Sequence, residues 1–181
     1  MRIVTGRYKG KMLIIPCGIR PTQNLVRKAV FDILGDIKGL SFLELFAGSG
    51  AVGFEALSRG ASEIVLVEHK RDCQEAIRRN IEALKADNCQ LIPKEAEAAI
   101  LCLQKGSKRF DIIFMDPPYY KGLAKQTLQT LIHYDTLKPH GFCVVQHFKR
   151  DELLKEPFGL ILLKQAHYGD TLLSFYRRKE S

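Results

Sequence analysis

Hydrophobic and polar residues follow two patterns along most of the chain, one typical of strands and one typical of helices. Short apolar runs are separated by longer stretches whose apolar residues recur every three or four positions. The short runs predict strands at 41–46, 63–67, 89–92, 110–115, 141–147, 159–166 and 171–177. The periodic stretches predict helices at 50–58, 70–86, 95–104 and 122–133, with a short helix at 151–155. This alternation is typical of βαβ units and predicts a mostly parallel sheet with helices on both faces.

The end of the chain departs from this alternation. Only Tyr168-Gly169-Asp170 joins the last two predicted strands, which is too short for a helical crossover, so these strands are expected to pair as an antiparallel hairpin. A chain of 181 residues has the length of one domain with a full core. We therefore expect a single α/β domain over residues 1–181, with a seven-stranded core at 36–181.

Residues 1–35 form an expected extension to that core. Runs at 2–5 and 12–15 predict a small β-hairpin, and helical spacing after Thr22, a typical capping residue, predicts a helix that ends near Gly35. The net charge of the chain is +8, and the first 31 residues hold seven of the 28 lysines and arginines but none of the 20 acidic residues. Such a concentration of positive charge at one end of the chain favours a phosphate-binding surface. A solvated arm with counterions is the alternative that charge alone leaves open.

Composition argues against several other classes of protein. Hydrophobic residues make up 46% of the chain and charged residues 27%, which is an ordinary globular balance and disfavours disorder. No apolar window is long enough for a membrane span, and the first residues lack the apolar core of a secretion signal. The five cysteines include no C-x-x-C pair, and the five histidines show no metal-ligand spacing. We therefore expect a cytoplasmic protein with no metal and no membrane partner.

A glycine-rich turn follows the first predicted strand of the core. Gly48, Gly50 and Gly53 fit the G-x-G-x-x-G pattern of nucleotide-binding loops, and Glu68 ends the next strand, where a ribose-binding acid is expected. Glu44 lies four residues before the first glycine. A carboxylate there would repel a pyrophosphate but attract the ammonium and sulfonium groups of S-adenosylmethionine. The pattern favours that cofactor over NAD, with tight strand-to-helix packing and no ligand as the alternative.

The fourth strand of the core runs into Asp116-Pro117-Pro118-Tyr119 at its carboxyl end, where α/β sheets hold their ligands. Prolines fix the backbone, so the Asp116 carboxylate and the Pro117 carbonyl become well-placed acceptors for both N–H groups of an aromatic amine. The carboxylate would also stabilise the positive charge that develops on a nitrogen attacking a methyl sulfonium. Tyr119 offers a ring for an unstacked base. A simple turn would not explain the acid, both prolines and the aromatic ring together.

These two motifs resemble those of the Rossmann-like S-adenosylmethionine-dependent amino-methyltransferases. The fuller resemblance is to the RsmD-type bacterial 16S ribosomal RNA (guanine-N2)-methyltransferases, and it covers nearly the whole chain. It is carried by the runs 2–10, 20–22 with 26–27, 45–50, 55–61 and 168–171. The Asp-Pro-Pro-Tyr run is shared with many DNA and RNA amine methylases and indicates the chemistry, whereas the other runs are more specific to this family.

The resemblance implies a class I methyltransferase fold and methylation of one guanine N2 amine in 16S small-subunit rRNA, in an assembled or partly assembled subunit. We expect a monomer, although the sequence does not determine the oligomeric state. The family more often has Asp in place of Glu44, and the nearest match to its adenine contact is Glu95-Ala96. The expected catalytic residues are Asp116, Pro117, Pro118 and Tyr119. The expected cofactor-binding residues are Glu44, Phe46, Ala47, Gly48, Ser49, Gly50, Glu68, His69, Glu95, Ala96 and Asp116. The expected RNA-binding residues are Arg7, Tyr8, Lys9, Arg20, Thr22 and Arg27.

Three other functions remain compatible with these motifs. Methylation of adenine or cytosine amines in DNA would use the same catalytic loop. A non-catalytic RNA-binding module would keep the fold and the basic arm without the reaction. An NAD enzyme would use the glycine turn, although the charge of Glu44 disfavours it.

Overall fold

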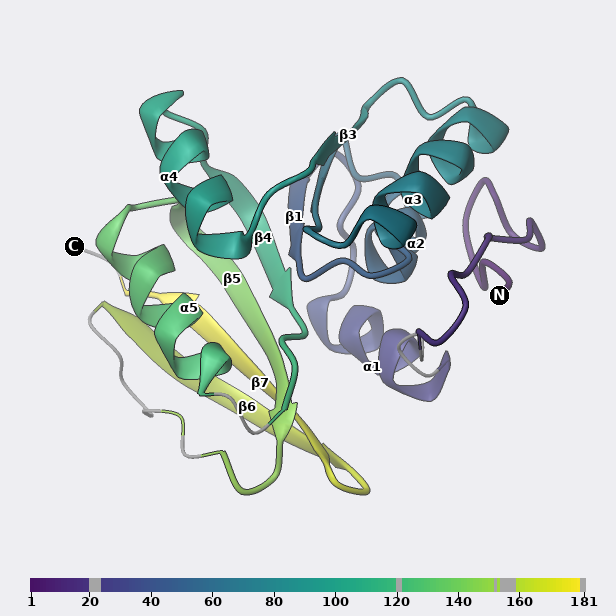
Figure 1. Cartoon of the computed structure of the whole chain (residues 1–181). Coiled ribbons are helices and arrows are strands. Elements are labelled where there is room, and N and C mark those ends of the chain that lie inside the picture. Colours follow the sequence, from purple (N-terminus) through teal and green to yellow (C-terminus); the bar gives the residue numbers. More distant parts are fainter. Residues whose placement is uncertain (20–23, 120–121, 152, 154–158, 180–181) are drawn as a thin grey trace. The chain divides into compact units, whose positions relative to one another are not determined.

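The computed structural model describes residues 1–19, 24–119, 122–151, 153 and 159–179. It divides into two compact parts, Met1–Glu95 and Ala96–Ser181 (Figure 1). The elements of the first part are α1 (Asn24–Leu34), β1 (Ser41–Leu45), α2 (Ala51–Ser58), β2 (Glu63–Val67), α3 (Arg71–Leu84) and β3 (Cys89–Ile92). The elements of the second part are α4 (Ala96–Lys105), β4 (Phe110–Met115), α5 (Leu123–His133), β5 (Leu137–Phe148), β6 (Leu160–Tyr168) and β7 (Thr171–Arg178).

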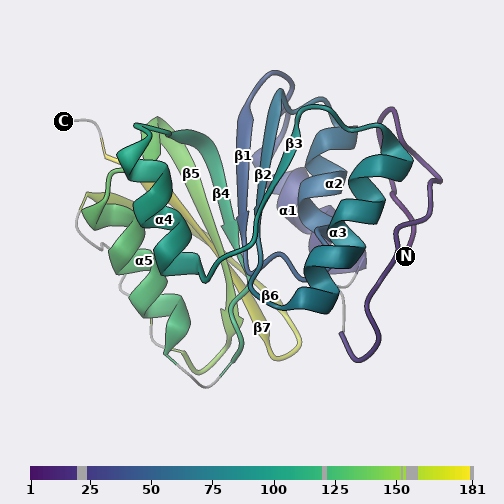
Figure 2. The same cartoon turned by 45° about the horizontal axis from the view of Figure 1, so that its top comes forward.

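Three parallel strands form the sheet of the first part, in the order β3-β2-β1. Helices α2 and α3 lie along one face of this sheet (Figure 2). Every residue of β1 is buried, as in the near-continuous apolar strands of parallel sheets. Glu44 differs from its neighbours in β1 because it carries a carboxylate although it is buried. A charge in such a place requires specific partners.

The sheet of the second part has the order β4-β5-β7-β6. Strands β4 and β5 are parallel, whereas β7 runs antiparallel to both of its neighbours. Helices α4 and α5 lie side by side on one face (Figure 1). Strand β4 is buried except at Asp111, which is half-buried, and it ends directly before Asp116. A rigid core strand therefore carries the predicted catalytic loop.

The core strands and helices lie within a few residues of their predicted positions, with one exception. Strand β5 begins four residues early, because the stretch with Pro139 and Gly141 continues the strand through an irregularity instead of forming a turn. His140 has a φ of 62° there. The helix predicted at 151–155 includes residues 152, 154 and 155, which lie outside the described residues. The assignment of 1–181 to one domain stays a prediction.

The N-terminal hairpin is much shorter than predicted. In place of two strands, the described residues form one antiparallel bridge, between Arg2 and Met12. The amides of Val4 and Thr5, which a longer ladder could use, instead donate to the Glu55 carboxylate on α2, at 2.9 and 3.0 Å. The expected strands were wrong in extent because a helix side chain takes these backbone groups.

Two more buried side chains fasten residues 1–15, here called the arm, to the helices of the first part. Ser58 Oγ, on α2, accepts a hydrogen bond from the amide of Tyr8 at 2.9 Å. Asn80, on α3, bonds both backbone groups of Ile14, at 2.8 and 3.0 Å. Buried backbone groups need such partners. The arm is therefore an ordered part of the fold.

A buried ion pair underlies the arm. Arg27 and Glu55 are each 1% exposed, and Arg27 Nε lies 3.7 Å from a carboxylate oxygen. The Arg27 guanidinium also donates to the carbonyl of Arg2 at 2.9 Å and to Oδ1 of Asn24 at 3.0 Å. Burial lowers the pKa of Arg27, while the charge of Glu55 acts in the opposite direction. Loss of either partner would leave a buried charge uncompensated, so the pair and the arm are coupled.

Gly6→Ala is expected to loosen the arm, with Gly10→Ala as its matched control. Both glycines have left-handed backbones, with φ of 77° and 86°, so alanine is strained at each by about 1–2 kcal/mol. At Gly6 a Cβ would also overlap the carbonyl oxygen of Ser58, whereas nothing lies within 4 Å of one at Gly10. Thermal unfolding should show a further loss of about 1–3 kcal/mol for Gly6→Ala. Equal losses would contradict this close contact.

Candidate active site

The turn after β1 is a loop whose shape depends on glycine. Phe46, Gly48 and Gly50 have left-handed φ values of 58°, 56° and 72°. The amide of Gly50 donates to the carbonyl of Ala47 at 2.7 Å, and α2 begins at the next residue. A Cβ at Gly50 would lie 2.8 Å from a ring carbon of Phe54. Both the backbone and the packing therefore require glycine here, and the loop leads into a helix N-terminus of the kind that binds ligands.

Glu44 lies under this turn. It is 3% exposed, and its Oε2 accepts a hydrogen bond from the amide of Gly53 in the first turn of α2 at 2.7 Å. A Cβ at Gly53 would lie 2.8 Å from the same oxygen, so glycine lets the helix approach the carboxylate. A buried negative charge acts at longer range than an exposed one, because less water screens it. The cofactor-binding role of Glu44 stays a prediction.

Glu68 joins the end of β2 to the glycine loop. Its Oε2 accepts from the amide of Gly48 at 2.8 Å, and its Oε1 accepts from the amides of His69 and Lys70, also at 2.8 Å. The side chain is almost fully buried. One carboxylate thus holds three backbone amides, and the loop is fixed from a position 20 residues away in sequence.

Two exposed side chains lie beside Glu68. His69 Nδ1 is 3.4 Å from a Glu68 oxygen and 3.5 Å from Oε2 of Glu95. The structure therefore brings together the residues predicted to contact ribose and adenine. Of the remaining predicted cofactor residues, Ser49 is buried in the loop and Ala96 is buried at the start of α4.

The predicted catalytic run directly follows β4. Asp116 and Tyr119 are half-buried, Pro117 is buried and Pro118 is exposed. The hydroxyl of Tyr119 lies 2.8 Å from Oγ1 of Thr171, and its ring centroid is 5.9 Å from that of Phe148 at a tilt of 40°. Sequence patterns did not predict these neighbours. Thr171 was present in the family-specific run 168–171, whereas Phe148 follows a long apolar strand and has no local signal.

A buried histidine precedes Phe148 in β5. His147 Nε2 lies 2.8 Å from Oγ of Ser174, and its Nδ1 is 3.0 Å from the carbonyl oxygen of Phe148. Gln165 donates to the same Ser174 hydroxyl at 2.9 Å. Burial lowers the pKa of His147, so the ring is neutral at physiological pH. These bonds link β5, β6 and β7 and give the histidine a structural role.

Three of the residues predicted to bind RNA lie on the arm. The Arg7 guanidinium is 4.5 Å from the centre of the Tyr8 ring, a distance typical of a cation–π contact. Arg7 and Lys9 are exposed and Tyr8 is half-buried. Two cations and a ring are therefore presented by a segment whose backbone is fixed.

The other three predicted RNA contacts differ from these. Arg27 is 1% exposed and holds Glu55, so it is inaccessible to a phosphate in this structure and stabilises the fold instead. Helical spacing could not show this, because the burial of Arg27 depends on the distant Glu55. Arg20 and Thr22 lie outside the described residues.

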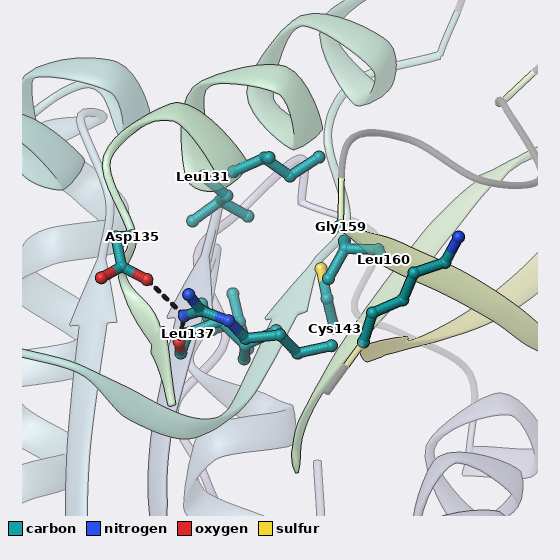
Figure 3. A pocket seen from close by; sticks show the side chains of 10 residues that line it. Leu131, Asp135, Leu137, Cys143, Gly159 and Leu160 are labelled. Atoms are coloured by element: carbon teal, nitrogen blue, oxygen red, sulfur yellow. Dashed lines mark hydrogen bonds and ion pairs between the residues drawn. The ribbon is translucent and has the colours of Figure 1, made fainter. Parts of the chain in front are cut away.

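A cavity of about 260 Å³ lies within the second part, and the residues that line it are not among those predicted to be functional (Figure 3). Its walls are mostly apolar, from residues that include Leu131, Leu137, Cys143 and Leu160. Asp135 and Arg178, which form an ion pair, also line it. Burial raises the pKa of the Cys143 thiol to about 12, so this cysteine is not a ready nucleophile.

The described ranges contain neither a cluster of potential metal ligands nor a helix with the length and hydropathy of a membrane span. Within them, no group of three or more His, Cys, Asp or Glu side chains could hold a metal ion. Likewise, none of the helices that the structure describes is long and apolar enough to cross a membrane. The candidate functional residues are the glycine loop with its carboxylates in the first part and the Asp116–Tyr119 run in the second part.

Solved structures of one fold resemble the whole chain. The Escherichia coli protein yhhF matches with a TM-score of 0.90 and 32% identity, over 99% of this chain and 98% of that chain. SMU.776, whose structure is a complex with SAH, has a TM-score of 0.70 at 18% identity, over 94% of this chain and 52% of that chain, which shows the fold alone. The fold is that of the Rossmann-like methyltransferases, as predicted.

The family follows from the sequence matches. Residues 1–177 match the family described as Conserved hypothetical protein 95. The Escherichia coli (strain K12) protein named Ribosomal RNA small subunit methyltransferase D is 32% identical over 182 residues, which cover 99% of this chain and 90% of that protein. The chain belongs to the Conserved hypothetical protein 95 family, and the predicted resemblance to the RsmD-type proteins is confirmed.

Glu68→Gln is expected to destabilise the glycine loop. One carboxylate oxygen becomes an NH₂ donor that faces backbone N–H donors, so at least one buried bond is lost, at a cost of about 1–3 kcal/mol. Glu75→Gln is the control, because Glu75 pairs with Arg79 at the surface of α3 and the change should cost less than about 0.5 kcal/mol. Urea unfolding of both variants measures the difference. Equal stability of the two would argue against Glu68 as the organiser of the loop.

Proposed function

We propose that the protein transfers a methyl group from S-adenosylmethionine to the exocyclic N2 amine of a guanine in small-subunit rRNA. The observation that carries this proposal is the Asp116–Tyr119 run at the end of the buried strand β4, in a chain of the Conserved hypothetical protein 95 family. The name of the Escherichia coli relative supports small-subunit rRNA as the substrate class. The sequence resemblance supports guanine N2 as the target.

The chemistry of the glycine loop suits this cofactor. Glu44 and Glu68 place two buried carboxylates at the loop, which would oppose the binding of a pyrophosphate but favours ammonium and sulfonium groups. Glu68, His69 and Glu95 offer hydrogen-bonding groups for the ribose and adenine. S-adenosylmethionine, when bound, supplies an electrophilic methyl group. SAH in the structure of SMU.776, a protein of the same fold, supports this choice.

The Asp116–Tyr119 run would prepare the amine. The Asp116 carboxylate and the Pro117 carbonyl accept hydrogen bonds from its two N–H groups and turn the nitrogen lone pair toward the methyl carbon. The Asp116 carboxylate would stabilise the positive charge that develops on the nitrogen as it takes the methyl group, until the extra proton passes to solvent water. Tyr119 stacks on the unstacked base. The reaction therefore relies on orientation and electrostatics without a covalent enzyme intermediate.

Asp116→Asn is expected to lower kcat by about 100-fold or more, because the variant cannot offer a negative charge to the developing cation. Asp111→Asn is the matched control at the other end of β4, where the carboxylate pairs with Lys138 at 2.8 Å. Labelled cofactor should be offered with rRNA, small subunits from cells that lack the enzyme, and duplex DNA. Label that enters only DNA, or full activity of Asp116→Asn, would contradict the proposal.

The arm is proposed to hold the RNA backbone through Arg7 and Lys9, with Tyr8 as a stacking surface. Phosphate contacts position the RNA, so loss of one should weaken binding without altering the target. Lys9→Ala should lower RNA affinity and reduce the slope of log K against log salt by about 0.7. Lys105→Ala, at the exposed end of α4, is the control. An equal change in both variants would show non-specific attraction and contradict a site on the arm.

A further inference from the structure

Two strand ends meet at the ring of Tyr119. Phe148 ends β5 and Thr171 begins β7, and the two residues are direct partners in the antiparallel register. Tyr119 contacts both, through the 2.8 Å hydroxyl pair with Thr171 and through its tilted ring beside Phe148. A phenol with a hydrogen bond at its hydroxyl and a ring contact along its side is restrained in both position and plane. Its half-buried state leaves part of it accessible to a ligand.

The strand ends are themselves braced. The Lys149 amide donates to the Asp170 carbonyl at 2.9 Å, and its ammonium lies 2.7 Å from the Asp170 carboxylate, a hydrogen bond that lowers the pKa of Asp170. On the other side, the Phe148 amide donates to Oδ2 of Asp151 at 3.2 Å, and the Asp151 amide donates to the Phe148 carbonyl at 2.9 Å. Thr171 and Phe148 therefore have local supports that do not involve Tyr119.

We propose that Thr171 is a positioning residue for methyl transfer that acts through Tyr119, and that Phe148 forms a second wall for the target base. This inference rests on the proposed function. Contacts between aromatic rings prefer particular mutual orientations, so the contribution of stacking depends on the angle at which the ring is held. The Thr171 hydroxyl holds that angle, and Phe148 limits how far a stacked base can slide. The acceptors of Asp116 and Pro117 then meet an amine that is already oriented.

Thr171→Val removes the hydroxyl but keeps the shape and the β-branched character of the side chain. We expect kcat to fall about 3- to 10-fold, while the KM for RNA stays within about twofold, because phosphate contacts dominate RNA affinity. Thr171→Ser keeps the hydroxyl and should restore kcat to within about twofold of the native value. A purely structural role would lower the unfolding temperature of Thr171→Val without this split between kcat and KM, which would overturn the inference.

Tyr119→Phe tests whether Thr171 acts through the phenol. It removes the other half of the hydroxyl pair and keeps the ring, so it should reproduce the kcat loss of Thr171→Val. If the two residues act as one unit, the double variant should be no slower than either single variant. Losses that multiply in the double variant would show independent roles and overturn the inference.

Phe148→Leu tests the second wall, with Phe148→Tyr as the variant that keeps a ring. We expect kcat/KM to fall about 5- to 20-fold for leucine and to stay near native for tyrosine, because the ring carries the contact. If the native protein methylates RNA and Thr171→Val, Tyr119→Phe and Phe148→Leu are all fully active, this inference alone is refuted. Native protein that methylates no RNA would refute the proposed function and this inference together.

Discussion

The N-terminal half of the protein depends on the hydrogen bonds and the ion pair that the buried Glu55 carboxylate makes. It receives two amides of the arm and pairs with Arg27, which in turn holds the backbone of Arg2. Burial of these charges is unfavourable unless they are paired with one another and hydrogen-bonded. Glu55 lies on α2, the helix that begins at the glycine loop. One short helix therefore connects the proposed RNA-binding arm with the proposed cofactor loop.

Local features were predictable from the sequence, and long-range ones were not. The strands and helices follow from apolar periodicity, and the glycine turn and the Asp116 loop follow from residue types at short spacing. The arm hairpin was overestimated because its amides bond to Glu55, which lies about 50 residues away. Similarly, Arg27 resembles any surface cation in a helix until its distant partner is known. Contacts of this kind leave no periodic signal.

The same limit applies to the candidate functional residues. The two carboxylates and the Asp116–Tyr119 run were identified as candidates from their places at strand ends. What supports Tyr119 was not, because Thr171 lies 52 positions further along the chain and Phe148 is hidden in an apolar strand. The antiparallel register of β5 and β7, which no short motif encodes, brings those two supports together. The sequence therefore pointed to candidate residues but not to the long-range contacts that orient them.

The three amides held by Glu68 have a thermodynamic consequence. A loop that was disordered before binding would lose conformational entropy whenever a ligand entered, and this loss would weaken the affinity. Here the loop is held during folding, because Glu68 accepts from the Gly48 amide and is itself fixed by the amides of His69 and Lys70. Occupancy of the site and release of a spent ligand can then proceed without refolding the loop, which suits an enzyme that must exchange one ligand for another in every cycle.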